Sequence, residues 1–239
     1  MMKLLVNIAF HYNEENIIYL EKLLESFINE YEVPVNIIID TNSDKINYLS
    51  NNNIKVVVHD NLVHPYHLTW MHRKHIKDNI DKYDIFMYAE HDMYVPYINY
   101  LNYLDNFKML FPRYVPSFIR IEKFDKKEYI VDIIKKQKLV KYYISDKKFT
   151  RLDNPYHAFW IMPKEELIKN MTSNFVRVDY SRELAASYLM WELKKPTMLE
   201  LNDNNNISNK CYSYHLTNNY VSMKNSPFAK IEVDDIFYR

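Results

Sequence analysis

The sequence predicts an α/β fold with a mostly parallel central sheet flanked by helices. In the first half of the chain, short apolar runs alternate with amphipathic segments, which is the order of strands and helices in a doubly wound sheet. The apolar runs end in polar clusters, as buried parallel strands do. The length of 239 residues suits one core of this kind better than two. We therefore expect a single domain over residues 1–239.

The first predicted strand begins close to the N-terminus. Leu4–Phe10 is an apolar run rich in β-forming residues. Asn13 is a suitable N-cap for the segment that follows, whose apolar residues recur at helical spacing. Residues 35–39 and 54–58 repeat the apolar pattern. They predict two further strands of the same sheet.

The next predicted strand leads to an acidic tripeptide. Residues 66–83 have helical spacing, and residues 84–89 form another apolar run that ends at the tripeptide 90–92. Residues 98–110 predict an amphipathic helix, which Pro112 stops because proline cannot continue it.

Beyond Pro112 the order of elements changes, and we expect a smaller β/α portion. The expected strands are 117–122, 129–134 and 139–144, the expected helices are 163–171 and 181–194, and a short strand from Met198 precedes a polar surface loop at 202–209.

The absence of glycine excludes several classes of function. Without glycine the chain cannot contain a GxGxxG dinucleotide motif, a phosphate P-loop, a kinase glycine-rich loop or a GxSxG elbow. A bound diphosphate would then be neutralised most naturally by a metal ion. Left-handed turn positions are expected to fall to asparagine, the next most tolerant residue.

Charge and cysteine content indicate the partners and the compartment. The 31 basic and 31 acidic residues cancel, so neither nucleic acid nor an anionic membrane is an expected partner. A single cysteine, Cys211, allows no internal disulfide and fits a reducing interior. No signal segment or membrane-length apolar span is recognisable, so we expect a cytoplasmic protein without a membrane span.

Glu90 and Asp92 follow their apolar strand abruptly. In open α/β sheets, ligands bind beyond the carboxyl ends of the strands. Two carboxylates two residues apart on extended chain point the same way and offer hard oxygen ligands to Mn²⁺ or Mg²⁺. His91 would then face away or add its imidazole to the site. The alternative interpretation is that the acids only end the strand and cap the next element.

Residues 83–88 (YDIFMY) followed by Glu90-His91-Asp92 resemble the D-x-D region of glycosyltransferases with the GT-A fold. The resemblance implies a GT-A-like domain in which this tripeptide serves the metal and the diphosphate of a sugar nucleotide. It further implies contacts to the nucleotide from the loops after the first two strands, which contain His11, Tyr12 and Asn13, and Asp40, Thr41 and Asn42.

Further segments are similar to those of glycosyltransferases found in large DNA viruses and microbes. These segments are 68–73, 115–122, 182–187 and 214–220. The resemblance implies a nucleotide-sugar-binding half over 1–112 and an acceptor-binding half over 113–239. If the source is a virus, the expected location is the cytoplasm of its host.

Transfer with inversion requires a base that deprotonates the acceptor hydroxyl, and Glu183 and Asp179 are the candidates. Glu183 lies near the start of a predicted helix, where it could also favour the helix dipole without any chemistry. The resemblance suggests His215 as a third metal ligand, like the late histidine of many GT-A enzymes. The alternative for His215 is a hydrogen-bonded, partly buried histidine.

Four histidines at positions 64, 67, 72 and 75 lie close together in the sequence, but they lack the HExxH spacing of a zinc site. We expect His72 and Arg73 to contact the diphosphate or the donor sugar instead, with Arg73 as a forked cation.

Four residues are candidates for binding the acceptor. Tyr156 and Trp160 could offer aromatic faces to a sugar ring, although ordinary core packing explains such residues equally well. Arg120 and Glu122 are candidate partners of sugar hydroxyls, with a surface ion pair as the alternative.

The sequence therefore predicts a metal-dependent enzyme that moves a hexose or deoxyhexose from a nucleoside diphosphate, with UDP as the expected nucleotide, to a glycan or glycoprotein acceptor. The candidate base favours inversion. One alternative is a metal-dependent nucleotidyltransferase or phosphohydrolase, because strand-end carboxylates and histidines also serve phosphoryl chemistry. Another is a non-catalytic, sugar-binding remnant of the fold.

Overall fold

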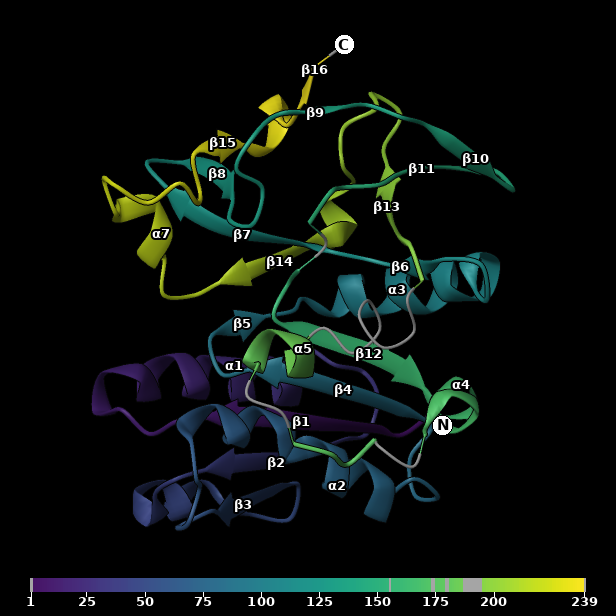
Figure 1. The fold of residues 1–239 in the computed structure, drawn as a ribbon. Coiled ribbons are helices and arrows are strands. Elements are labelled where there is room, and N and C mark those ends of the chain that lie inside the picture. The colour runs from purple at the N-terminus through teal and green to yellow at the C-terminus, as the bar shows by residue number, and fades with distance from the viewer. Residues whose placement is uncertain (1, 155, 173–174, 179–180, 187–194, 239) are drawn as a thin grey trace. The chain divides into compact units, whose positions relative to one another are not determined.

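The computed structural model describes residues 2–154, 156–172, 175–178, 181–186 and 195–238 (Figure 1). The chain divides into two compact units. Unit 1 comprises Met1–Met93 and Ala158–Tyr188, and unit 2 comprises Tyr94–His157 and Leu189–Arg239. The chain thus passes from one unit to the other after residues 93, 157 and 188. The division into a donor-binding half over 1–112 and an acceptor-binding half over 113–239 stays a prediction.

Unit 1 is built on a five-stranded, mostly parallel sheet with the order β12-β4-β1-β2-β3 (Figure 1). Its strands are β1 (Leu4–Phe10), β2 (Val35–Thr41), β3 (Ile54–Val58), β4 (Ile85–Glu90) and β12 (Phe159–Pro163). β1 lies parallel to β2 and β4, and β2 lies parallel to β3. The predicted α/β fold with a mostly parallel central sheet is confirmed.

Helical segments flank this sheet and connect its strands. They are η1 (Glu14–Asn16), α1 (Ile17–Asn29), η2 (Asp44–Leu49), η3 (Pro65–Trp70), α2 (His72–Asp78), α4 (Lys164–Asn170) and α5 (Arg182–Ala186). Asn13 caps η1 as predicted, because its side chain accepts a hydrogen bond from the Glu15 amide at 3.0 Å. α1 buries one apolar face made of Leu20, Leu23, Leu24 and Phe27.

The segment 66–83, which was expected to be helical throughout, is divided into the 3₁₀ helix η3 and the short helix α2. η3 begins with Pro65, and the His64 side chain caps it by accepting a hydrogen bond from the Tyr66 amide at 3.2 Å. α2 ends at Asp78, and the backbone of Asn79 is not helical, with φ −120° and ψ 13°. The predicted strand 84–89 is present as β4.

β12 is a strand that the sequence analysis did not identify. It runs antiparallel to β4, with Trp160 opposite Tyr88, and residues 159–162 are buried. The Trp160 ring is 1% exposed, and its indole nitrogen donates a hydrogen bond to the Ala185 carbonyl at 3.3 Å. The expectation that Trp160 offers its face to an acceptor sugar is therefore corrected, because the ring belongs to the core of unit 1.

Unit 2 combines the helix α3 (Tyr97–Leu110) with short strands. α3 ends two residues before Pro112, as predicted. The strands lie in sheets of order β10-β11-β13-β6, β15-β8-β7-β14-β5 and β16-β9. Their bounds are β5 (Met93–Tyr94), β6 (Val115–Pro116), β7 (Ile119–Phe124), β8 (Lys127–Ile130), β9 (Gln137–Lys138), β10 (Tyr142–Ile144), β11 (Lys147–Thr150), β13 (Thr197–Leu201), β14 (Tyr212–His215), β15 (Ile231–Glu232) and β16 (Phe237–Tyr238), with η4 (Asn209–Cys211), α7 (Asn219–Ser222) and η5 (Val233–Asp235) between them.

β7 and β8 form a hairpin whose turn explains why the predicted strand 129–134 was misplaced. Phe124 pairs with Lys127, so only Asp125 and Lys126 lie in the turn. Both have positive φ, 47° and 62°, which is the backbone of a tight two-residue turn usually made with glycine or asparagine. β8 therefore starts at Lys127 and ends at Ile130. Asparagine was expected at left-handed positions, but of the seven positive-φ residues in the described ranges only Asn205 and Asn218 are asparagines.

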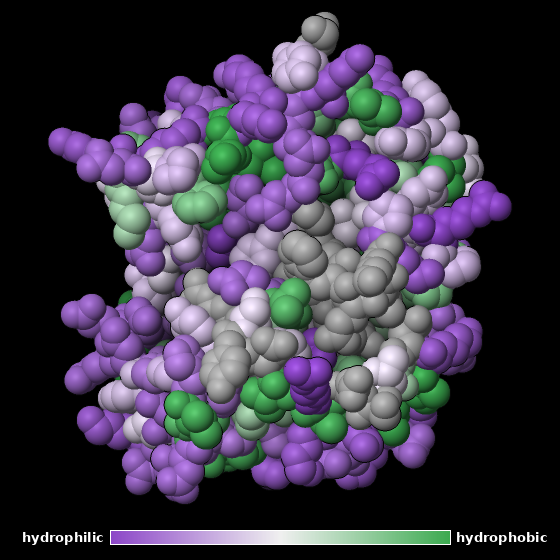
Figure 2. Space-filling view, viewed as in Figure 1, coloured by the Kyte–Doolittle hydropathy of each residue, from purple (hydrophilic) through white to green (hydrophobic). Residues whose placement is uncertain are grey.

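The surface seen in Figure 2 is mostly hydrophilic, and its hydrophobic side chains lie in small, separate groups. Among the helices of the described residues, none combines the length and the apolar character needed to cross a membrane. Of the predicted helix 181–194, residues 182–186 form α5 and residues 187–194 lie outside the described ranges.

Candidate functional site

The parallel pairing in unit 1 brings the carboxyl ends of four strands to one edge of the sheet. Phe10 lies opposite Thr41, Thr41 lies opposite Val58, and Ala9 lies opposite Glu90. The residues that follow these positions therefore gather at the same edge. In open α/β sheets this is the edge where ligands bind.

A pocket of about 270 Å³ lies at the ends of β1 and β4. This volume is near the lower end of the roughly 300–1,000 Å³ that is usual for ligand sites. Three of the residues predicted to bind a nucleotide sugar, His11, Glu90 and His91, contribute to its wall. The pocket is lined by Ala9, His11, Pro65, Tyr66, Leu68, Thr69, Glu90 and His91. The wall supplied by η3 was not anticipated from the sequence.

The loops after β1 and β2 are joined by a hydrogen bond. The Tyr12 amide donates to the Asn42 side-chain oxygen at 2.7 Å. The ammonium group of Lys45 lies 5.1 Å from the centre of the Tyr12 ring. Asn13 uses its side-chain oxygen to cap η1. Tyr12 and Asn42 thus hold two strand ends together, whether or not a nucleotide contacts them.

The acidic tripeptide adopts a different backbone from the one expected. Glu90 is the last residue of β4, whereas His91 and Asp92 form a turn that leads into β5. The alternation of side chains along an extended strand therefore does not apply to Glu90 and Asp92. Both side chains are half-buried, and the His91 ring packs 5.0 Å from the Phe10 ring. The two carboxylates remain hard oxygen donors of the kind that Mn²⁺ and Mg²⁺ bind.

The residues predicted at the end of β2 are buried among other protein groups. Asp40 is 1% exposed and Thr41 is 0% exposed. One Asp40 oxygen, Oδ1, lies 2.7 Å from His59 Nε2 and 2.8 Å from His75 Nε2. The contact of Asp40 and Thr41 with a nucleotide that was expected therefore does not agree with their burial, and only Asn42 is half-exposed.

Within the described ranges, Asp40, His59 and His75 form one group of three side chains that could hold a metal ion, with ligand atoms within 4.8 Å of one another. This group was not predicted from the sequence, which assigned His75 to the cluster of four nearby histidines. The parallel pairing of β2 with β3 was the available signal, because it brings the residues at the two strand ends together.

His72 and Arg73 point into unit 1, each being 1% exposed. The Arg73 guanidinium lies 4.3 Å from the Trp70 ring centre and donates to the Phe175 carbonyl at 3.2 Å. Burial lowers the pKa of His72 well below its ordinary value, so this imidazole is neutral at neutral pH. The expected contacts of both residues to a diphosphate are corrected, because neither side chain reaches the surface.

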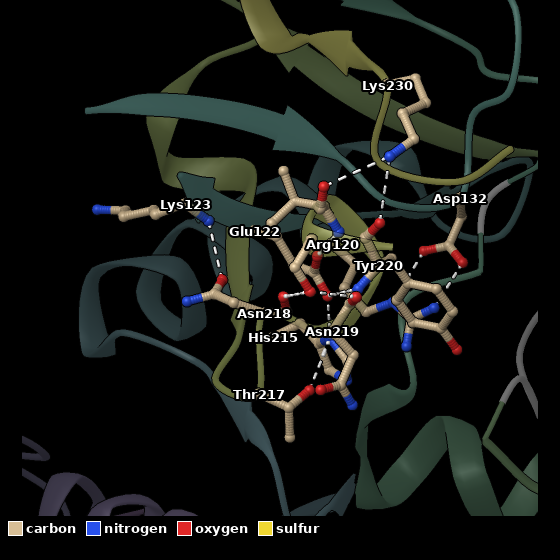
Figure 3. Close-up of polar contacts among 12 residues, drawn as sticks. Arg120, Glu122, Lys123, Asp132, His215, Thr217, Asn218, Asn219, Tyr220 and Lys230 are labelled. Carbon is tan, nitrogen blue, oxygen red and sulfur yellow. Dashed lines mark hydrogen bonds and ion pairs between the residues drawn. The ribbon is translucent and has the colours of Figure 1, made fainter. Parts of the chain in front are cut away.

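In unit 2, Glu122 and His215 form a buried pair (Figure 3). His215 Nδ1 lies 2.6 Å from Glu122 Oε1, and the Glu122 carboxylate also accepts hydrogen bonds from the amides of Tyr220 and Val221 at 3.2 and 2.6 Å. Burial would raise the pKa of Glu122, but these hydrogen bonds outweigh burial and lower it. Glu122 is 0% exposed, so the expected contact with a sugar hydroxyl is corrected.

Arg120 forms a buried ion pair with Asp132 (Figure 3). Its guanidinium donates from Nε and Nη2 to the two carboxylate oxygens at 3.0 and 2.7 Å. The same group lies 5.1 Å from the Tyr156 ring centre and 5.5 Å from the Tyr220 ring centre. Protein groups thus surround Arg120 on several sides. Its ion pair is buried and not at the surface, and the expected contact of Arg120 with a sugar hydroxyl does not agree with this position.

The remaining predicted residues are placed only in part. Glu183 is exposed in the first turn of α5, and Ser181 Oγ donates to its carboxylate at 3.1 Å. Asp179 lies outside the described residues. His215 belongs to unit 2, whereas Glu90 and Asp92 belong to unit 1, and each unit is described by itself. A metal site shared by these three residues stays a prediction.

Comparison with known proteins gives likenesses of fold. No protein-family model matches the chain, and no curated protein matches it. Among solved structures, 4-diphosphocytidyl-2C-methyl-D-erythritol synthase from Anaerococcus prevotii DSM 20548 is similar, with a TM-score of 0.41 and 11% identity over 87% of this chain and 90% of that one. S. aureus TarS 1-349 is similar with a TM-score of 0.49 and 12% identity over 90% of this chain. The chain spans 61% of that TarS chain. The function proposed below is therefore supported by the residues of the site.

Proposed function

We propose that the chain is a metal-dependent glycosyltransferase that moves a hexose or deoxyhexose from a nucleoside diphosphate, with UDP as the expected nucleotide, to a saccharide acceptor. The observation that supports this most is the pocket at the ends of β1 and β4, where His11, Glu90 and His91 meet. These are residues that the resemblance to GT-A glycosyltransferases implicates in binding the donor. A pocket beyond parallel strands suits a nucleotide, and it needs no glycine-rich loop.

Carboxylates of unit 1 are proposed to hold the divalent cation. Glu90 and Asp92 would supply oxygen ligands, and His215 is the imidazole ligand that the resemblance suggests. Glu122 is bonded to Nδ1 of His215, which is the kind of carboxylate contact that orients a metal-binding histidine. The Thr217 hydroxyl lies 3.1 Å from Nε2, so an ion at Nε2 would displace it. When bound, the cation would stabilise the negative charge of the departing diphosphate.

The remaining groups would bind and orient the acceptor. Glu183 is exposed and could take the proton of the acceptor hydroxyl, so that the oxygen attacks the anomeric carbon from the face opposite the diphosphate. Such a direct displacement inverts the configuration. Tyr156, which is half-buried beside Arg120, is the aromatic residue proposed to contact the acceptor ring.

Binding of the donor is tested by thermal unfolding and calorimetry with UDP-, GDP- and dTDP-sugars, with and without Mn²⁺. We expect one nucleotide class to stabilise the protein only when Mn²⁺ is present, by about 2.7 kcal/mol at a ligand concentration 100 times its Kd. Stabilisation by UDP-sugars would identify the donor class. If none of the nucleotide sugars changes the unfolding temperature or releases heat, the proposal is wrong.

A further inference from the structure

Asp40, His59 and His75 form a polar cluster in unit 1, and none of them lines the pocket at the ends of β1 and β4. Asp40 lies in β2, His59 follows β3, and His75 lies in α2. The His59 amide donates to the Thr41 carbonyl at 2.8 Å, which fixes the position of His59 next to the end of β2. Three separate elements therefore bring one carboxylate and two imidazoles to a single point.

The Asp40 carboxylate of this cluster is buried, and one of its oxygens lacks a partner within the described ranges. Asp40 is 1% exposed, and its Oδ2 has no hydrogen-bond partner among the residues that the structure describes. Both imidazoles approach the other oxygen, Oδ1, and they carry positive charge only if they are protonated. A buried carboxylate oxygen without a hydrogen bond or an opposite charge is costly, because nothing replaces its lost hydration.

We propose that Asp40, His59 and His75 bind a divalent transition-metal ion. Two neutral imidazoles and one carboxylate are a donor set typical of Zn²⁺ sites with an open position and of related non-haem iron sites, whereas Mg²⁺ and Ca²⁺ prefer oxygen donors alone. The ion would balance the charge of the Asp40 carboxylate. The side chains of His59 and His75 are 22% and 16% exposed, so solvent can reach the site to deliver the ion.

This site differs in its ligands and its chemistry from the one proposed for the sugar donor. It would connect the ends of β2 and β3 to α2, and so stiffen the sheet edge. The inference does not rest on glycosyltransferase activity, because it uses none of Glu90, Asp92 and His215. Zn²⁺ binding and Mn²⁺-dependent nucleotide binding can consequently be measured, and can fail, separately.

The test is a calorimetric titration of the full chain with Zn²⁺, together with the visible absorption spectrum of the Co²⁺-loaded protein. We expect one tight Zn²⁺ site that excess Mg²⁺ does not empty, and Co²⁺ bands that show imidazole ligation. His59→Gln and His75→Gln should each weaken Zn²⁺ binding at least tenfold. Removing a group that only hydrogen-bonds to a metal ligand already lowers metal affinity by about tenfold or more. Asp40→Asn should do the same while keeping the side-chain volume.

Matched controls are His67→Gln, which lies in η3, and Asp60→Asn, which is exposed directly after His59. Both should bind Zn²⁺ as the wild type does, and circular dichroism should show that every variant is folded. The proposal is overturned if the wild type binds no Zn²⁺, or if folded His75→Gln and His59→Gln bind it with unchanged affinity. The second result would mean adventitious binding at other histidines. Asp92→Ala should leave Zn²⁺ binding unchanged.

Discussion

Asp132→Ala should lower the free energy of unfolding by about 3–5 kcal/mol, which is the usual cost of breaking a buried ion pair by removing one partner. Asp132 accepts two hydrogen bonds from Arg120, and the two side chains are 9% and 8% exposed. Burial raises the pKa of Asp132 even though the Arg120 guanidinium acts in the opposite direction. The pair is therefore costly to bury, and the variant would leave the buried cation without its counter-charge.

Urea denaturation measures this effect, and two variants serve as controls. Lys127→Ala removes one side of an exposed pair with Glu232, whose N–O distance is 2.6 Å, and should lower the free energy of unfolding far less than Asp132→Ala does. Replacing both members of the buried pair, as in Arg120→Met with Asp132→Leu, should recover much of the stability lost in Asp132→Ala. A loss no larger for Asp132→Ala than for Lys127→Ala would contradict the structural role given to the pair.

Asp92→Ala should abolish Mn²⁺-dependent binding of the nucleotide sugar and leave the fold intact. Asp92 is half-buried in the turn after β4, next to a residue that lines the pocket, and its carboxylate is one of two proposed for the cation in unit 1. Without it the diphosphate would lose the charge that neutralises it. Calorimetry with the nucleotide that the wild type binds gives the measurement.

The matched control for this variant is Asp60→Ala, which removes an exposed carboxylate of the same unit. It should bind the nucleotide sugar as the wild type does. If Asp92→Ala keeps the affinity of the wild type in the presence of Mn²⁺, the metal does not bind through Asp92, and the proposed site is wrong.

The central strands could be predicted because their apolar runs are local and are bounded by polar residues. β1 and β3 begin and end at the predicted residues. β12 was missed because its partner β4 lies about 70 residues earlier, with Trp160 opposite Tyr88. A run of apolar and aromatic residues does not show which distant strand it pairs with. The same residues would equally suit an exposed aromatic surface that binds a sugar ring.

The edge of the sheet that carries the site could also be predicted, since parallel strands end together. The side chains that face solvent at this edge could not be predicted. Arg73 is buried by Phe175, which is 102 residues away in sequence, and the cluster of Asp40, His59 and His75 depends on three elements meeting. The turn at His91 and Asp92 likewise depends on β5, a two-residue strand without a pattern of its own.

The measurement that tests the central claim most directly is the identity of the product formed from the nucleotide sugar that the protein binds, with Mn²⁺ and a panel of saccharide acceptors. We predict that nucleoside diphosphate is released and that the sugar is recovered on the acceptor, and that chelation of the metal stops both. Release of nucleoside monophosphate or pyrophosphate would contradict the account and indicate phosphoryl transfer, and binding without any release would indicate a sugar-binding protein that does not turn over.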